Sequence, residues 1–561
     1  MSRVIAKFAM SKPIYFIMRK HFILPIMIMA TVAGCTGARV EGEKTNDSSI
    51  VASQSSAVVD TDRGKIAGYI KDGTYIYRGV PYAKAERFMP PVEADRWDGV
   101  RSCRHYGPTA PQAVRQGYSN DEIAFAFDWD DGYAGEDCQR LNIWTPGIND
   151  GKKRPVMVWL HGGGYSAGSG QELPSYDGAH LSQKGDVVVV TLNHRLNVLG
   201  FLDLSAFGDK YADSGNAGML DIISALKWIK TNISNFGGDP DNVTIFGQSG
   251  GGGKVTTLTA SPMAEGLFHK AIVQSGSVRG AMTRENSQKI GMAVLEELNI
   301  SPAHIDEIST VPYDKLLAAG ERAIERVKKE YEKENGTVNM MFGWSPVVDG
   351  RMLTEQPYMN GAPACSKNVP MIIGTTLNEF APSVYVPQMR NLPMEKVMEM
   401  VRSQYGDLTD KYVAAFEQTY PGYKPNDLID TDYIFRPTAV KQADLKAQSG
   451  GAPVWMYIFA WQSPILDGSL RATHCMEIPF VFNNADVHAS MTGGTPEAMT
   501  LADKMSGAWI NFARTGNPGT DWPAYTAEDG ATMWWDNTPE IKHNHDRELL
   551  KVVEMVPQRR P

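Results

Sequence analysis

Cysteine is scarce in this sequence, with five residues among 561. No two of the five stand at the CxxC spacing that structural zinc sites and dithiol redox motifs require. A chain of this length can bury a core large enough to fold without a metal ion or a disulfide. We therefore expect no metal site, and a fold that depends on its hydrophobic core.

Basic residues are also few relative to acidic ones: 55 lysines and arginines stand against 64 aspartates and glutamates, a net charge of -9. A nucleic-acid-binding protein usually carries a basic patch or stripe, and no segment of this sequence has that composition. Apolar residues make up 42% and charged residues 21%, which is ordinary for a globular protein and excludes a disordered chain. We therefore expect no nucleic-acid partner.

The N-terminal hydrophobic run is short. It covers residues 22–34 and follows Arg19-Lys20-His21. A membrane-spanning helix needs about 20 apolar residues, whereas a basic flank, a short apolar segment and small residues at its end are typical of a secretory signal. The run ends in Val32-Ala33-Gly34-Cys35, which resembles a bacterial lipobox, where the cysteine becomes the lipidated first residue.

These features predict the organisation of the chain. Residues 1–35 are interpreted as a lipoprotein-type signal peptide with Cys35 as the lipidation site, and residues 36–56 as a flexible linker rich in Ser, Thr, Gly and charge. The protein is then exported from a bacterial cell and held by this lipid anchor alone, facing the periplasm or the exterior. A plain signal peptide with an incidental cysteine is the alternative, and Met18 is an alternative start to Met1.

Residues 57–561 are expected to form a single α/β domain with a mostly parallel sheet flanked by helices, because short strand-like runs alternate with helical periodicity. Several of these runs are continuously apolar, as expected for strands buried on both faces. The clearest predicted strands are 156–160, 187–192, 243–246, 369–373 and 454–459. Apolar residues at steps of three and four predict a helix over Asp221–Phe236, and residues 282–335 are expected to form a mostly helical insertion.

Two glycine clusters directly follow predicted strands. The second cluster contains Gly247-Gln248-Ser249-Gly250-Gly251, the GxSxG pattern of a nucleophile elbow. In such an elbow the serine occupies a strained turn with small neighbours, which lifts its hydroxyl clear of the sheet. A phosphate-binding loop ending at Lys254 would need glycine at position 248, which holds Gln248, so this alternative is excluded.

The first cluster, His161-Gly162-Gly163-Gly164-Tyr165, supplies what an attacking serine needs. Attack on an acyl carbon puts negative charge on the carbonyl oxygen, and backbone N–H groups aimed at that oxygen stabilise it. The N–H groups of Gly163, Gly164 and Gly250 are therefore the predicted oxyanion hole. A purely structural glycine turn is the alternative for this cluster.

With these residues in place, the chain resembles the type-B carboxylesterase family, the cholinesterase-like branch of the α/β-hydrolases. The resemblance runs from about Val59 to Tyr525. The segments that carry it include Arg78–Ala83, Glu136–Cys138, Leu141–Trp144, Gly215–Asp221, Ala225–Ile229, Phe236–Pro240, Phe512–Pro518 and Trp522–Tyr525. It implies the α/β-hydrolase fold with helical insertions over the active site, and chemistry without a metal or organic cofactor.

The resemblance also implies a Ser-His-Glu triad. Ser249 is the nucleophile, Glu379 matches the acid that follows a strand, and His474 matches the base that precedes a Glu-hydrophobic-Pro segment. Asp349 is the rival acid, although it matches a structural turn of the family. The implied function is hydrolysis of small-molecule carboxylic esters through an acyl-enzyme. An amidase, a thioesterase or an acyltransferase would use the same triad, and a non-catalytic cholinesterase-like binding module is the distant alternative.

Three departures from the family pattern stand out. Gly250 stands where alanine is usual and is followed by Gly252, Gly253 and Lys254, a departure that is expected to open the acyl pocket. The family cysteine that pairs across the first loop is replaced by Ala110, so a disulfide between Cys103 and Cys138 is only a candidate, with two free thiols as its alternative. Cys475 follows the predicted catalytic histidine, where glycine is common.

Overall fold

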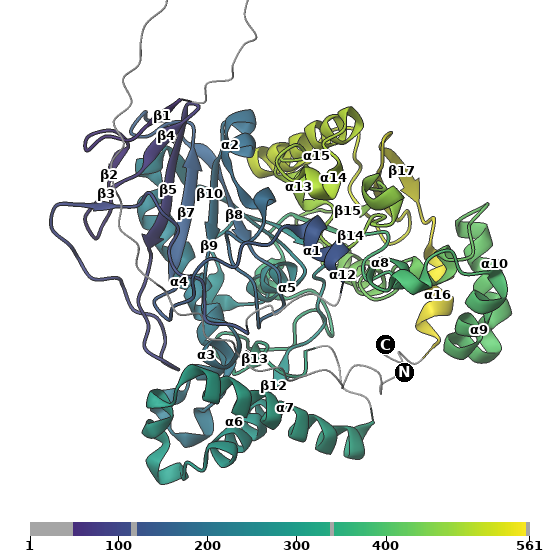
Figure 1. Cartoon of the computed structure of the whole chain (residues 1–561), viewed down its shortest axis with the longest axis horizontal. Helices are drawn as coiled ribbons and strands as arrows, with labels where there is room; N and C mark the ends of the chain where they lie inside the picture. The colour runs from purple at the N-terminus through teal and green to yellow at the C-terminus, as the bar shows by residue number, and fades with distance from the viewer. Residues whose placement is uncertain (1–48, 114–119, 337–340, 557–561) are drawn as a thin grey trace, which may run out of the picture. The chain divides into compact units, whose positions relative to one another are not determined.

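The computed structural model describes residues 49–113, 120–336 and 341–556 (Figure 1). These ranges fall within one folded unit, Ser48–Pro561. Cys35 and most of the predicted linker lie outside the described residues, so the signal-peptide prediction stays a prediction. In the described part of the chain, no helix is long and apolar enough to cross a membrane.

A large sheet forms the centre of this unit. Within the described residues it has twelve strands in the order β1-β4-β5-β7-β9-β8-β10-β11-β14-β15-β16-β17. The strands from β9 to β16 pair in parallel, and the outer strands pair antiparallel. Their bounds are β1 Ile50–Val51, β4 Tyr69–Lys71, β5 Thr74–Pro81, β7 Arg140–Thr145, β8 Arg154–Leu160, β9 Val188–Leu192, β10 Gly238–Gln248, β11 Lys270–Gln274, β14 Met371–Thr376, β15 Val454–Phe459, β16 Ala531–Trp535 and β17 Glu540–His543.

Two small sheets accompany the large one. The first joins β2 Val58–Asp60, β3 Lys65–Ala67 and β6 Val100–Ser102, and the second joins β12 Met282–Thr283 and β13 Val347–Val348. At the edge of the large sheet, β1 pairs with β4. The sheet therefore begins at Ile50, inside the segment 36–56 that the sequence predicts as a linker.

The five predicted strands are confirmed, as β8, β9, β10, β14 and β15. Strand β8 shows why the sheet is buried on both faces. Val156, Val158 and Leu160 belong to one hydrophobic core, and Met157 and Trp159 to another. Side chains alternate between the two faces of a strand, so each face of the sheet has its own core. Each fully buried residue of this kind contributes about 1.5–3 kcal/mol of hydrophobic free energy.

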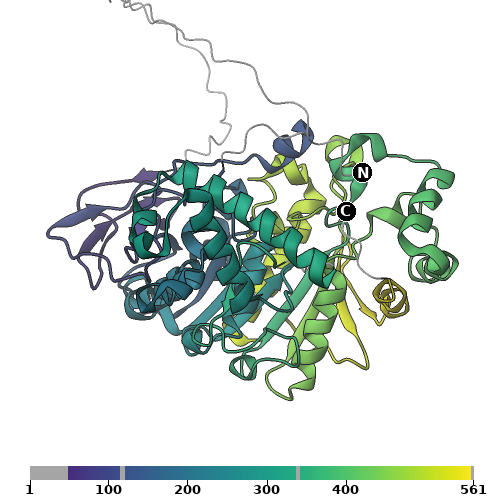
Figure 2. The ribbon, with the colours of Figure 1, turned by 90° about the horizontal axis from the view of Figure 1, so that it is seen from below.

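Helices cover both faces (Figure 1). They are α1 Asp121–Phe127, α2 Ala179–Gly185, α3 Asn197–Phe201, α4 Ala217–Asn232, α5 Gly250–Leu258, α6 Arg284–Leu298, α7 Tyr313–Asn335, α8 Pro382–Tyr385, α9 Met394–Tyr405, α10 Thr409–Thr419, α11 Asp427–Asp430, α12 Arg436–Gln448, α13 Ile478–Val481, α14 Ala489–Thr492, α15 Pro496–Thr515 and α16 Arg547–Glu554. The predicted helix 221–236 is confirmed as α4 and a following 3-10 turn, Ile233–Phe236. The predicted helical region 282–335 is confirmed as α6, the 3-10 segment Pro302–Thr310 and α7, and Figure 2 shows these helices in teal from below.

The candidate disulfide is not formed, and the alternative with two free thiols describes the structure. Cys103 packs in the core that contains Val156, whereas Cys138 packs against Ala110 and Leu196. Ala110, which replaces the family cysteine, thus lies where a partner for Cys138 would be needed. Burial raises the pKa of the Cys103 thiol to about 11 and that of Cys138 further, so both thiols stay protonated at neutral pH.

Candidate active site

The nucleophile elbow forms as predicted between β10 and α5. Ser249 has φ 57° and ψ −124°, a conformation that is strained for a residue with a side chain. Its N–H donates to the Gln274 carbonyl at 2.8 Å, and its own carbonyl accepts from the Gly253 N–H at 2.9 Å. A methyl group at Gly251 would lie 1.9 Å from the Leu160 carbonyl oxygen, so only glycine allows the elbow to approach β8 this closely.

Glu379 and His474 meet beside this elbow. Glu379 follows β14, and His474 lies in the loop between β15 and α13. The His474 Nδ1 pairs with Glu379 Oε2. The backbone N–H of His474 also donates to the backbone carbonyl of Glu379, at 2.9 Å. The other carboxylate oxygen, Oε1, accepts from the Thr376 N–H at 2.8 Å. Both side chains are buried. The pairing directs Nδ1 to the carboxylate and leaves Nε2 pointing away from it.

Gln248 links the imidazole to the elbow. Its Nε2 lies 3.3 Å from His474 Nδ1 and 3.4 Å from His474 Nε2. Within the described residues, no hydrogen bond joins the Ser249 hydroxyl to the imidazole. Serine–histidine contacts are often long in a free enzyme and shorten when substrate binds, so this geometry is compatible with a triad.

The predicted oxyanion donors come together. Gly163 and Gly164 have φ 79° and 61°, which glycine adopts readily. Within the described part of the chain, the N–H groups of Gly163, Gly164 and Gly250 donate to no protein acceptor. A methyl group at Gly250 would lie 2.3 Å from the Gly164 carbonyl oxygen and 2.5 Å from its nitrogen. The glycine turn therefore packs directly on the start of α5.

This contact corrects one expectation. The sequence predicts a wider acyl pocket because Gly250 stands where alanine is usual. The structure shows that this space is not open, since the Gly164 backbone occupies it. Asp349, the rival acid, has other partners than His474: its Oδ1 accepts from the N–H groups of Arg351, Met352 and Leu353 at 2.9–3.1 Å, and its Oδ2 from Asn216 at 2.8 Å. It holds a turn.

Aromatic rings around His474 escaped sequence reasoning. The Phe380 ring centroid lies 4.4 Å from that of His474, and Phe435 lies 5.4 Å from it. Phe380 is 46% exposed, which is high for a phenylalanine. Phe380 directly follows Glu379, so its position could have been noticed. Phe435 precedes α12, and only the tertiary structure brings it to the site.

Cys475 occupies a strained position beside the base. Its φ is 73°, which explains why glycine is common there, and its Sγ lies 3.0 Å from Gln248 Oε1. No group of His, Cys, Asp and Glu side chains among the described residues is arranged to hold a metal ion.

The fold and the strand-turn-helix arrangement at Ser249 are those of an α/β-hydrolase. The chain belongs to the carboxylesterase family, whose model matches residues 55–552. It is 37% identical over 515 residues to the para-nitrobenzyl esterase of Bacillus subtilis, covering 90% of this chain and 99% of that protein. It is 32% identical to the phenmedipham hydrolase of Pseudarthrobacter oxydans, covering 85% of this chain and 94% of that protein.

Solved structures agree with this assignment. An esterase from anaerobic Clostridium hathewayi, described as able to hydrolyze aliphatic aromatic polyesters, matches with a TM-score of 0.81 at 36% identity. The match covers 91% of this chain and 100% of that one. A thermophilic para-nitrobenzyl (PNB) esterase matches with a TM-score of 0.72 at 35% identity, covering 88% and 99%. The protein is therefore a carboxylic ester hydrolase.

Proposed function

We propose that the protein hydrolyses small-molecule carboxylic esters with Ser249 as nucleophile, His474 as base and Glu379 as the acid that orients the base. The observation that carries this proposal is the buried His474–Glu379 pair beside the strained Ser249 elbow. A binding module without catalysis needs none of these features together. An amidase, a thioesterase and an acyltransferase remain alternatives because they use the same residues.

The geometry supports a two-step reaction. His474 Nε2 accepts the Ser249 proton while the serine oxygen bonds to the ester carbon. The carbonyl oxygen becomes negative and accepts hydrogen bonds from the Gly163, Gly164 and Gly250 N–H groups, each worth about 10²–10³ in rate. His474 then gives its proton to the alcohol oxygen as the C–O bond breaks. Water, activated by the same imidazole, releases the acid from Ser249.

The surroundings of His474 bear on the alcohol part of the substrate. The leaving alcohol must lie within hydrogen-bond reach of His474 to receive its proton. Phe380 and Phe435 contact the imidazole and offer apolar ring surface there. We propose that esters of apolar or aromatic alcohols are preferred, in keeping with the relative named para-nitrobenzyl esterase.

The nucleophile is tested by Ser249→Ala, measured with p-nitrophenyl butyrate and with a fluorophosphonate probe that labels active serines. We expect kcat/KM to fall by about 10⁴–10⁶ and the labelling to disappear. Ser275→Ala is a matched control: Ser275 follows the next strand, β11, has φ 49° and bonds to Gly374 in the way that Ser249 bonds to Gln274. If Ser249→Ala retains activity or labelling, the proposed mechanism is wrong.

A further inference from the structure

Lys254 is fully buried, and its ammonium group has few partners. It lies in α5, one turn after Gly250. Lysine is rarely fully buried unless it is paired with an opposite charge, because burial removes its hydration. Within the described residues, no carboxylate lies within ion-pair distance of Nζ. The Nζ donates to a backbone carbonyl instead, that of His161, at 2.9 Å.

The carbonyl that Lys254 binds belongs to the start of the glycine turn. His161 stands between the last residue of β8 and Gly162, so its carbonyl shares a peptide plane with the Gly162 N–H. The residues that follow, Gly162 to Gly164, have no side chains that could hold them in place, and glycine backbones are the least restricted. The Gly163 carbonyl accepts from the N–H groups of Ser166 and Ala167 at 3.3 and 3.0 Å, and a contact from outside the turn adds to this restraint.

Helix α5 contacts the other end of the turn as well. The Tyr165 hydroxyl, directly after the glycines, lies 3.5 Å from the Thr257 hydroxyl of α5. The Lys254 Nζ also lies 5.7 Å from the Tyr165 ring centroid. The same helix begins with Gly250, whose N–H is itself one of the three predicted oxyanion donors. Helix α5 therefore carries one predicted oxyanion donor, the Gly250 N–H. It also contacts both ends of the glycine turn that carries the other two donors, Gly163 and Gly164.

We infer that Lys254 is a positioning residue that fixes the glycine turn relative to Ser249, so that the Gly163, Gly164 and Gly250 N–H groups converge on one oxygen. This inference rests on the proposed function. Donors to an oxyanion act only within a few tenths of an ångström of their proper distance, and a misplacement of about 1 Å costs about 10²-fold in rate.

Lys254 can donate to the His161 carbonyl in either protonation state, because an ammonium group and a neutral amine both carry N–H bonds. A hydrogen bond from an ammonium group is roughly twice as strong as one from a neutral donor. Burial lowers the pKa of Lys254 to about 7, while the Glu172 carboxylate acts to raise it. The other polar groups around it are His161, Tyr165 and His194, and burial together with the Lys254 charge keeps the pKa of His194 well below its usual value.

The inference is tested by Lys254→Met, which keeps the length of the side chain and removes the donor. We expect kcat for p-nitrophenyl butyrate to fall by about 10–100-fold with KM within about twofold. The melting temperature should not fall, because replacing a buried charge with an apolar side chain is often neutral or stabilising. A lower kcat with an unchanged KM and melting temperature distinguishes a positioning role from a purely structural one.

A trifluoromethyl ketone inhibitor sharpens the measurement. Ser249 Oγ bonds to the ketone carbon, its proton passes to His474, and the carbonyl electron pair becomes an oxyanion. Affinity for this inhibitor should fall by the same factor as kcat/KM. The matched control is Lys446→Met: Lys446 is equally buried and, among the described residues, donates to the backbone carbonyls of Ser366 and Lys367 at 2.6 and 2.9 Å. It should leave kcat and inhibitor affinity unchanged.

Two results would overturn the inference: a Lys254→Met enzyme with kcat within twofold of the wild type, or a lower kcat without a matching loss of inhibitor affinity. Lys254→Gln, which keeps a short neutral donor, is made in parallel. If neither variant folds, Lys254 serves folding and the inference is also overturned. Ser249→Ala distinguishes a failure of the proposed function from a failure of this inference. If Ser249→Ala retained activity, the proposed function would be wrong, independently of the result for Lys254.

Discussion

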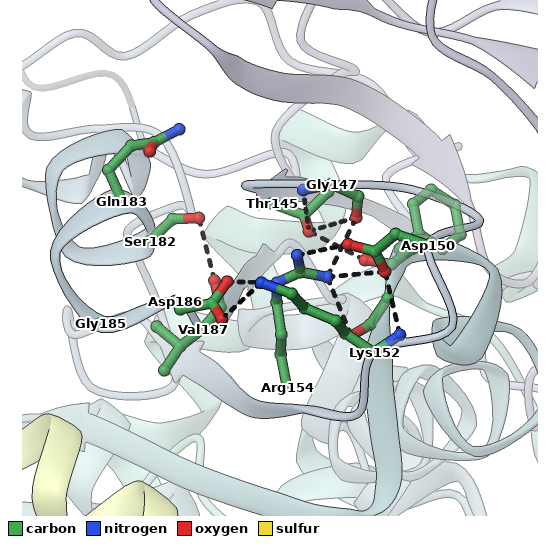
Figure 3. A network of polar contacts seen from close by, with 12 residues as sticks. Thr145, Gly147, Asp150, Lys152, Arg154, Ser182, Gln183, Gly185, Asp186 and Val187 are labelled. Carbon is green, nitrogen blue, oxygen red and sulfur yellow. Dashed lines mark hydrogen bonds and ion pairs between the residues drawn. The ribbon is translucent and has the colours of Figure 1, made fainter.

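A buried cation lies at each end of strand β8. One is paired with carboxylates, and the other donates to a backbone carbonyl. Arg154 is the first residue of the strand, and its side chain is 3% exposed. Two carboxylates match it, Asp150 and Asp186 (Figure 3). Lys254 lies at the other end and is equally buried, yet within the described residues it holds only the His161 carbonyl by a hydrogen bond.

At the Arg154 end of β8, hydrogen bonds join the guanidinium group to two carboxylates. Its Nη2 and Nη1 donate to the two oxygens of Asp150 at 2.6 and 3.1 Å, and its Nε donates to Asp186 at 2.6 Å. Lys152 adds a contact to Asp186 at 3.2 Å. Burial works against the charge of Arg154, but the hydrogen bonds to both carboxylates outweigh it, so the pKa of Arg154 is raised.

The two ends of β8 therefore differ in how a buried cation is stabilised. A cation matched by two carboxylates, of which Asp150 binds through both oxygens, keeps the start of the strand in place. A cation that lacks such a match is costly to bury, and departures of this kind concentrate at functional sites. The contrast predicts that changes at the Lys254 end affect mainly the rate of catalysis, whereas changes at the Arg154 end affect mainly stability.

Among the changes that test this contrast, the largest expected effect is the loss of kcat in Gly163→Ala, near the Lys254 end of β8. Gly163 has φ 79°, and an added methyl group would lie 2.3 Å from the Ala167 carbonyl oxygen, so the turn must move. We expect kcat to fall by about 10²–10³ as the donors shift. Gly151→Ala is the control near Arg154, because Gly151 has a similar φ of 71° but open space around its Cα. Equal kcat values for the two variants would contradict the contrast.

A smaller effect, on stability, is expected from Arg154→Met. The two carboxylates would lose their shared partner but keep access to water, so we expect the free energy of unfolding to fall by about 1–3 kcal/mol. Urea unfolding measures this, and kcat should stay within twofold. Lys152→Met is the matched control: Lys152 is 57% exposed, and such surface ion pairs contribute about 0–1 kcal/mol. A large loss of kcat in Arg154→Met would show that the two ends are not separate.

The smallest effect concerns acid. The hydrogen bonds from Arg154 hold the pKa of Asp150 below its usual value. A carboxyl group whose pKa is lower in the folded state stabilises the fold above its unfolded pKa, about 3.9, and this contribution is lost as the pH falls through the folded value. The stability difference between the wild type and Arg154→Met should therefore shrink below about pH 4. Urea titrations at pH 6 and pH 3 measure it, and an unchanged difference would refute this account.

Much of the candidate site could be predicted because its signals are local. The elbow follows from small residues around Ser249 at the end of an apolar strand, and a tight turn there admits few conformations. Glu379 and His474 were found through short motifs of the family. The aromatic contact between Phe435 and His474 has no such signal, because the two residues are distant in sequence and meet only through packing.

Lys254 illustrates the limit most clearly. In the sequence, its spacing from the glycines excludes a phosphate-binding loop and says nothing more. Its burial depends on how α5 packs under the glycine turn, which involves β8, α5 and Tyr165 together. The same holds for Cys103 and Cys138, for which the sequence left a disulfide and two free thiols open.

The fold class, the main strands and the Ser249 elbow followed from the sequence, because hydrophobic periodicity and backbone sterics act over a few residues. The proposed roles of Glu379 and His474 came from the resemblance to the family. The tertiary structure alone decided that the Gly164 backbone fills the space beside Gly250, that Cys138 faces Ala110, and that one end of β8 holds a matched cation and the other an unmatched one. These are contacts between segments far apart in the chain, and only packing sets their distances.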